Sequence, residues 1–146
     1  MSSFTYQRQV SAPPEIVFDV LTDHRGYARI TPLRRVELER QGEPPPNGVG
    51  AIRVLRLAGP PLREEVVAYQ PPRRFSYRLL SGLPVRDHLG SVSLEPVEGG
   101  THVTYAVRAT PTVPLGGAVL ALIEQAVGTL LRGVAKESER RAAGNG

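Results

Sequence analysis

Between residues 33 and 109 the chain repeats one pattern, in which apolar side chains occupy every second position of short segments. This alternation is typical of β-strands, because successive side chains of a strand point to opposite faces of its sheet. Six segments show it, namely 33–41, 49–57, 62–70, 73–81, 85–96 and 101–109. Proline and glycine fill the connections, as in GEPPPNG, AGPP and SGLP, which favours tight turns. Because these connections are too short for parallel crossovers, the segments predict an antiparallel meander.

Further elements flank the meander on both sides. Residues 4–10 alternate as a first strand, and SAPPEIVFDVLTD then predicts a short helix opened by a double proline. Residues 23–30 predict a second short helix. After Pro114 apolar residues recur every three or four positions, which predicts a long helix over 115–141. The order of elements indicates an α+β fold, in which a curved seven-stranded antiparallel sheet wraps around one long C-terminal helix.

Composition limits the class of protein. With 146 residues, 40% of them apolar, we expect one domain with its core over about 4–138 and a disordered tail over 142–146. The chain has no cysteine and its N-terminus lacks the apolar run of a secretory signal, which predicts a cytoplasmic protein. Glu124 and Gln125 interrupt the long apolar tract of the last helix, so no transmembrane segment is expected. The net charge of +4 comes from scattered arginines without a recognised motif, which gives little support to nucleic-acid binding.

Three stretches together resemble one family. VSAPPEIVFDVLTD is similar to a strand followed by the pattern APxxxVFxxLxD. NGVGAIRVL followed by LREEVVAYQPPRRFSYRLL resembles a GxxR stretch with E-V-x-x-PPxRxxY, and LEPVEGGTHVTY resembles a GGTxVxW turn with Tyr105 where tryptophan is common. In order and spacing, these motifs resemble the START-like, or SRPBCC, superfamily, within its polyketide cyclase/dehydrase and lipid-transport group. The resemblance extends over residues 4–138.

The resemblance implies a helix-grip fold of the Bet v 1-like and START-like kind, with two short helices after the first strand. It also implies a deep apolar pocket between the sheet and the C-terminal helix. The first function to expect is binding of a hydrophobic small molecule, such as a lipid, a polyketide or an aromatic metabolite. The alternative is an enzyme, a polyketide cyclase or dehydratase of the lyase type, and a second alternative is a protein-interaction module. The fold alone does not decide between them.

Strand 85–96 carries polar side chains that the alternation places on the inner face. Counting back in twos from Val92 puts Gly90, His88 and Arg86 on that face. An inward Arg86 is predicted to hold a polar group of the ligand, since a buried guanidinium needs a partner. His88 is the candidate catalytic residue, because imidazole titrates near neutral pH. A strand end open to water, or a bulge that shifts the alternation, would instead leave both side chains solvated.

Aromatic and helical side chains complete the predicted ligand site. Tyrosine and phenylalanine rings suit an aromatic or lipid-like ligand, and ordinary core packing explains the tyrosines equally well. The alternation places Arg74 and Arg78 on the opposite, solvated face. The predicted lining consists of Tyr69, Phe75, Tyr77 and Tyr105 from the sheet and Leu122 and Ala126 from the last helix.

Glu64 and Glu65 are adjacent on one predicted strand, so they point to opposite faces of the sheet. Alternation groups Glu65 with the side of Tyr69, but the pattern does not decide which glutamate is inward. An inward glutamate opposite Arg56 or Arg86 would form a buried ion pair, which is structural more often than catalytic.

Metal and cofactor sites have little support in the sequence. His24, His88 and His102 lack the spacing of metal ligands, and we expect His24 and His102 to be solvated. A phosphate-binding glycine loop and a nucleophile elbow are both missing from the chain. We therefore expect no metal and no other cofactor.

Overall fold

The computed structural model describes residues 2–23, 26–31, 35–56, 59–114 and 116–144. The strands are β1 (Ser2–Val10), β2 (Arg35–Arg40), β3 (Ile52–Arg56), β4 (Leu62–Gln70), β5 (Arg74–Ser81), β6 (Val85–Val97) and β7 (Gly100–Pro111). They form one seven-stranded antiparallel sheet in the order β1-β7-β6-β5-β4-β3-β2. The predicted meander from β2 to β7 is therefore confirmed, and β1 extends it by pairing with β7.

The described residues form the helices α1 (Pro14–Thr22), α2 (Tyr27–Ile30) and α3 (Gly116–Gly144). The expectation of two short helices after the first strand is wrong in its second part. One short helix, α1, has nine residues, whereas α2 is only a single turn of four. Asp23 ends α1 and Gly26 precedes α2, so residues 23–30 do not form a continuous helix. His24 lies outside the described residues.

The long helix α3 is confirmed, and it extends further than predicted. It continues through residues 142–144, where the sequence analysis expected a disordered tail. Ala142 and Ala143 favour helix strongly, which explains the extension. Leu115, the predicted first residue, lies outside the described residues.

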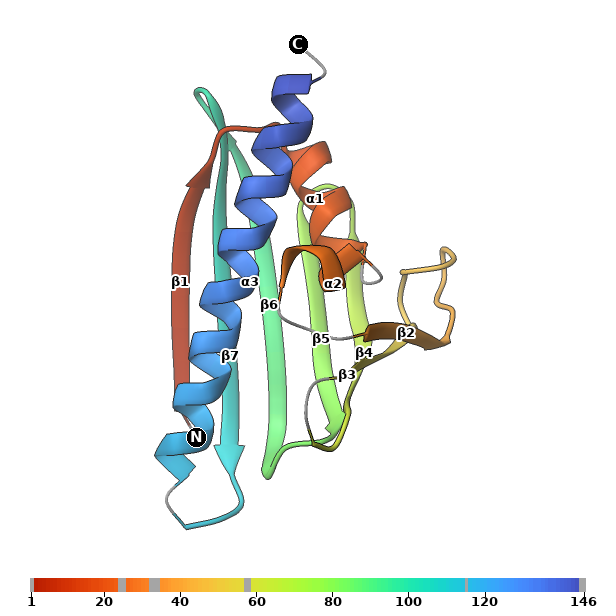
Figure 1. Cartoon of the computed structure of the whole chain (residues 1–146), viewed down its shortest axis with the longest axis vertical. Coiled ribbons are helices and arrows are strands. Elements are labelled where there is room, and N and C mark those ends of the chain that lie inside the picture. The colour runs from red at the N-terminus through yellow and green to blue at the C-terminus, as the bar shows by residue number, and fades with distance from the viewer. Residues whose placement is uncertain (1, 24–25, 32–34, 57–58, 115, 145–146) are drawn as a thin grey trace.

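Figure 1 shows α3 running lengthwise along the sheet, with α1 and α2 beside it. The helix packs on β1 and β7, while α1 packs on β6, β7 and α3. Gly133 lets α3 pass close to α2, because a Cβ atom at this position would collide with the backbone oxygen of Ile30. The core lies between the sheet and these helices, and its largest members include Phe18, Leu21, Phe75 and Tyr105.

In the described sheet the pairing register shifts at four places, which changes the side chains that point inward. The shifts lie between Leu38 and Arg40 in β2, between Arg63 and Glu64 where β4 pairs with β5, between Val66 and Ala68 in β4, and in β6 after Arg86. A bulge adds one residue to its strand, so the alternation is reversed beyond it and the sheet bends. Alternation therefore predicts which side chains point inward only within a stretch of strand that contains none of these shifts.

Candidate functional site

The concave face of the sheet carries a charged side chain in its interior. Arg53 of β3 is only 1% exposed, and its Nε atom donates a hydrogen bond of 2.8 Å to Oε1 of Glu64 on β4. Aromatic rings surround the guanidinium, whose Cζ atom lies 4.5 Å from the ring centre of Tyr77, 5.2 Å from that of Phe75 and 5.8 Å from that of Tyr27. These five residues form a buried ionic and aromatic cluster, which we call the Arg53 cluster.

One donor of this guanidinium has nothing to bind. Nη1 of Arg53 is buried and has no hydrogen-bond partner among the described residues. Burial disfavours the charged form, but the Glu64 carboxylate and the neighbouring tyrosines outweigh it and raise the pKa of Arg53. The group is therefore a permanent cation in an apolar interior. Such a donor costs free energy unless a partner satisfies it.

Tyrosine hydroxyls lie next to the cation. The hydroxyls of Tyr77 and Tyr105 hydrogen-bond to each other, and the hydroxyl of Tyr27 donates to the backbone oxygen of Leu21. Burial raises the pKa of Tyr27 to about 12 and also raises the pKa values of Tyr77 and Tyr105. All three phenols are protonated at neutral pH, so they act as hydrogen-bonding groups and not as bases.

Gly90 makes room for the ring of Tyr77. A Cβ atom at Gly90 would lie 2.5 Å from Cζ of Tyr77 and 2.8 Å from its hydroxyl oxygen. The predicted inward position of Gly90 is confirmed, and the missing side chain allows the ring to lie directly against β6.

His88 also lies in the interior, as predicted. It is 8% exposed, and its ring centre is 5.5 Å from that of Tyr77. The backbone N–H of Leu79 donates a hydrogen bond of 3.1 Å to Nδ1 of His88, and burial lowers the pKa of this imidazole. The ring is therefore neutral near pH 7 with its proton on Nε2, so its basic nitrogen is already occupied.

The prediction for Arg86 is wrong. Its side chain is 70% exposed, and its Nε atom lies 3.9 Å from Oδ2 of Asp87. The guanidinium is therefore in water and not in the interior. The register of β6 shifts between Arg86 and Leu89, and Asp87 adopts a positive φ of 54°. This bulge breaks the alternation, so His88 points inward while Arg86 remains in water.

The predictions for Leu122 and Ala126 are wrong as well. Leu122 is 62% exposed and Ala126 is also exposed. The face of α3 that meets the sheet consists instead of Ile123, Val127 and Leu131, which are spaced by four residues. The first half of α3 is apolar on several sides, so the pattern alone did not identify the buried one.

The remaining predicted site residues differ in how deeply they are buried. Phe75, Tyr77 and Tyr105 are buried together, whereas Tyr69 is half-buried and its ring lies 5.3 Å from Phe18 of α1. The bulge in β4 turns Tyr69 inward although Glu65 is outward.

Nε2 of His102 is 3.2 Å from an oxygen of Gln7 in an exposed hydrogen bond, as expected for a solvated position. In the described part of the chain, no group of three His, Asp or Glu side chains could hold a metal ion.

Arg53 and Tyr27 are site residues that the sequence analysis missed. Arg53 stands between Ala51 and Leu55 at strand spacing, which is the signal for an inward cation. In the β3–β4 hairpin it pairs directly with Glu64. The predicted partners of an inward glutamate, Arg56 and Arg86, are both wrong, because Arg56 pairs with Glu37 and Arg86 lies near Asp87. Tyr27 had no comparable signal, because its position depends on the packing of α2.

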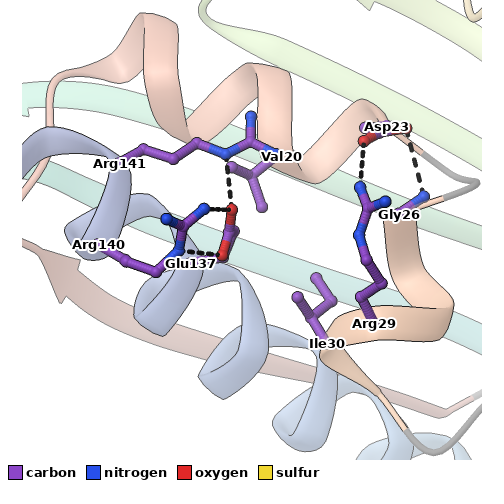
Figure 2. Close-up of a pocket in the computed structure, with 8 residues that line it drawn as sticks. All are labelled: Val20, Asp23, Gly26, Arg29, Ile30, Glu137, Arg140 and Arg141. Carbon is purple, nitrogen blue, oxygen red and sulfur yellow. Dashed lines mark hydrogen bonds and ion pairs between the residues drawn. The ribbon is translucent and has the colours of Figure 1, made fainter. Parts of the chain in front are cut away.

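At least two hollows border the core in the described part of the chain. The larger, of about 250 Å³, lies between the three helices and is shown in Figure 2, where its lining is Val20, Asp23, Gly26, Arg29, Ile30, Glu137, Arg140 and Arg141. Glu137 accepts hydrogen bonds of 2.9 and 2.7 Å from Arg140 and one of 2.8 Å from Arg141, which lower its pKa to about 2. Asp23 and Arg29 are 3.7 Å apart. Three arginines and two carboxylates line this hollow, so its lining carries one uncompensated positive charge, and its carboxylates are already bound to arginine.

The second hollow, of about 180 Å³, separates the sheet from the first half of α3. It is lined by Ser2, Ser3, Phe4, Val107, Ala109, Leu120 and Glu124. Val107 pairs with Gly90, so the apolar wall of this hollow continues toward Tyr77 and the Arg53 cluster. The sheet and the long helix are therefore incompletely packed at this end.

The sequence matches the polyketide cyclase/dehydrase and lipid transport family over residues 1–142. The chain belongs to this family. Its fold is one that typically binds hydrophobic ligands. No curated protein sequence matches the chain.

Solved structures show the same helix-grip fold at low sequence identity. The protein XoxI from Bacillus cereus is 16% identical with a TM-score of 0.76, and the match covers 94% of this chain and 96% of that one. Ara h 8.0201 is 14% identical with a TM-score of 0.78, covering 94% and 97%. The di-domain ARO/CYC StfQ of the steffimycin biosynthetic pathway is 15% identical with a TM-score of 0.80, covering 97% of this chain and 51% of StfQ. At these identities the likeness establishes the fold alone.

Proposed function

We propose that this protein binds a hydrophobic small molecule between the sheet and α3 and holds a polar atom of that molecule at Arg53. The observation that carries the proposal is the buried Nη1 of Arg53, which has no partner among the described residues. The donor lies among aromatic rings in an otherwise apolar core. A ligand with an apolar body and one acceptor oxygen would satisfy it, as a lipid, a polyketide or an aromatic metabolite would.

Entry is proposed through the hollow between β1, β7 and α3. Its 180 Å³ is smaller than the roughly 300 Å³ at which drug-sized pockets begin. Binding therefore requires α3 to move away from β7, or the ring of Tyr77 to turn away from Gly90. The weakly covered first half of α3 favours the movement of the helix.

A cyclase or dehydratase is the second candidate, and the similarity to the ARO/CYC StfQ supports it. Ring closure by aldol chemistry needs a base that removes a proton from the substrate. Nδ1 of His88 accepts from Leu79, the Glu64 carboxylate is paired with Arg53, and the phenols of the cluster are protonated. These occupied groups favour binding over turnover, and we propose His88 as a hydrogen-bond donor through Nε2.

The test uses displacement of 1-anilinonaphthalene-8-sulfonate from the purified protein by a C14 fatty acid and by a planar aromatic phenol. Ala109 is fully buried and lines the hollow, so Ala109→Trp should fill the entry and weaken binding at least tenfold. Ala106→Trp, on the opposite face of β7, is the matched control and should bind as the unmodified protein does. Native mass spectrometry of protein from its own host should reveal a bound small molecule. Absence of both a bound molecule and saturable displacement would refute the proposal.

A further inference from the structure

The first half of α3 exposes an apolar surface. An 18-residue window of this helix has a mean hydropathy of 1.5, yet only 28% of it is buried. Leu122 is 62% exposed, and Val113 in the preceding loop is 41% exposed. Single exposed leucines are common on protein surfaces, but a contiguous apolar stretch of a helix usually has something to contact.

The exposed side chains lie along one side of the helix. Ala118, Leu122 and Ala126 are spaced by four residues and are all exposed, so they follow one another on the side opposite Ile123 and Val127. The stripe itself has no acidic residue, and the exposed Gln125 and Glu124 lie beside it on the same half of α3. It contains small and apolar side chains over the first half of α3, which allows close approach of a flat surface.

Basic side chains continue this side of α3 toward its C-terminal end. Arg132, Lys136 and Arg140 are exposed, and Arg140 is also bound to Glu137. In the described part of the chain, Arg132 and Lys136 have no carboxylate within ion-pair distance; Arg132 bonds only to the hydroxyl of Thr129. We call the surface made of Ala118, Leu122, Ala126, Arg132, Lys136 and Arg140 the outer face of α3.

We propose that the outer face of α3 docks on an anionic lipid surface. Leu122, and Val113 from the loop before α3, would enter the interfacial region, while Arg132 and Lys136 would contact the lipid headgroups. A second copy of the chain fits this face poorly, since pairing of antiparallel helices would place Arg132 and Lys136 against the apolar half of the partner, which offers them no carboxylate. A nucleic acid would use the cations but leave the apolar half of the face without a role.

The two halves of the face are both required for binding. A basic residue near an anionic bilayer contributes about fivefold to the partition coefficient, and insertion of one leucine contributes about tenfold. Neither half alone would give stable association, so the protein would bind reversibly and only to charged membranes. This inference is independent of the proposed ligand, because it concerns the solvent side of α3.

Co-sedimentation with vesicles tests the proposal. The full chain should bind vesicles that contain 30% phosphatidylglycerol and should not bind vesicles of phosphatidylcholine alone. Leu122→Gln should weaken binding about tenfold and Arg132→Gln with Lys136→Gln about 25-fold, and added salt should weaken it further. Leu80→Gln is the matched control, since Leu80 is 37% exposed on β5, away from α3, and its replacement should leave binding unchanged.

A fluorescent reporter tells docking on the membrane apart from charge attraction alone. The chain contains no tryptophan, so Leu122→Trp introduces a single reporter at the centre of the face. Its emission should shift to shorter wavelength with the anionic vesicles, and brominated lipids should quench it, whereas Leu80→Trp should show neither effect. Failure to bind anionic vesicles, or binding that is insensitive to both sets of variants, would overturn the proposal. So would a dimer in solution that Leu122→Gln dissociates.

Discussion

Glu64 and Glu65 are neighbours on β4, and each is bound to arginine, yet their surroundings differ sharply. The side chain of Glu64 is 10% exposed and pairs with Arg53, whose side chain is 2% exposed. Glu65 faces the convex side of the sheet, where its side chain is 17% exposed and its partners Arg40 and Arg78 are 55% and 56% exposed. Two adjacent glutamates of β4 are therefore both paired with arginine, one with a cation buried in the apolar core and the other with cations that reach water.

The comparison shows that an ion pair must be judged by its surroundings. At the surface, water screens both charges, and such pairs contribute about 1 kcal/mol or less. In the core, desolvation of each ion costs several kcal/mol, which the attraction between them only partly offsets. The inner pair also leaves Nη1 of Arg53 without a partner in the part of the chain that the structure describes. This cost to stability supports the proposed role of Arg53 in ligand binding.

The largest expected effect comes from Glu64→Gln, which keeps the shape of the side chain but removes its charge. Arg53 would then be a buried cation without a counterion, so the free energy of unfolding should fall by about 3–5 kcal/mol. Urea denaturation followed by circular dichroism measures this change. A loss below about 1 kcal/mol would mean that water reaches the inner pair and that the two environments are alike.

The double variant Arg53→Met with Glu64→Leu separates stability from function. Replacing a buried ion pair by apolar residues of similar size is often neutral or stabilising, so most of the loss should be recovered. Displacement of the fluorescent probe by an oxygen-bearing ligand should nevertheless be weakened, because the donor has gone. Recovery of both properties would show that Arg53 has no role in binding.

Gly90→Ala should have the next largest effect. The added methyl group lies 2.5 Å from Cζ of Tyr77, so the ring must shift and the hydrogen bond between Tyr77 and Tyr105 is disturbed. Overpacking of this kind costs about 1–3 kcal/mol. Thermal unfolding is the measurement, and Gly117→Ala is the control, since its methyl group meets nothing within 4 Å and alanine favours helix by up to about 1 kcal/mol. Equal effects of the two changes would argue against tight packing around Arg53.

His88 should make stability depend on pH. Burial lowers its pKa in the folded protein, so below the unfolded value of about 6.5 the unfolded chain binds more protons and the fold loses stability as the pH falls. One such group contributes at most about 1.4 kcal/mol per pH unit. His88→Asn offers an oxygen to the N–H of Leu79 without titrating, and it should flatten the profile of unfolding free energy between pH 7 and 5. An unchanged slope would show that another group controls the dependence.

The strands could be predicted from the sequence because alternation and turn residues are local signals. The order of the six segments from 33 to 109 and the inward positions of Phe75, Tyr77 and His88 followed from them. The face to which Arg86 and Tyr69 point could not be counted from neighbouring residues of their strands. Bulges at 86–89 and 66–68 reverse the alternation without a clear sequence signal.

The helix was harder to orient than the strands. Periodicity predicted α3 itself, but its first half is apolar on several sides, so Leu122 and Ala126 were assigned to the buried face. Only the tertiary packing of Ile123 and Val127 on the sheet decides which side is inward.

The partner of Glu64 depends on hairpin register, which places Arg53 opposite it. Strand existence is thus encoded locally, whereas the composition of the site depends on register and packing.

Glu65→Gln should have the smallest effect and completes the comparison with Glu64→Gln. It removes the carboxylate that holds Arg40 and Arg78, but both arginines remain hydrated, so no buried charge is left behind. The free energy of unfolding should fall by about 1 kcal/mol or less, and the difference from the unmodified protein should shrink further in 0.5 M salt. The matched Glu64→Gln variant should keep its deficit at the same salt concentration, because ions do not reach the core. A salt response shared by both variants would contradict the assignment of one glutamate to the interior and the other to the surface.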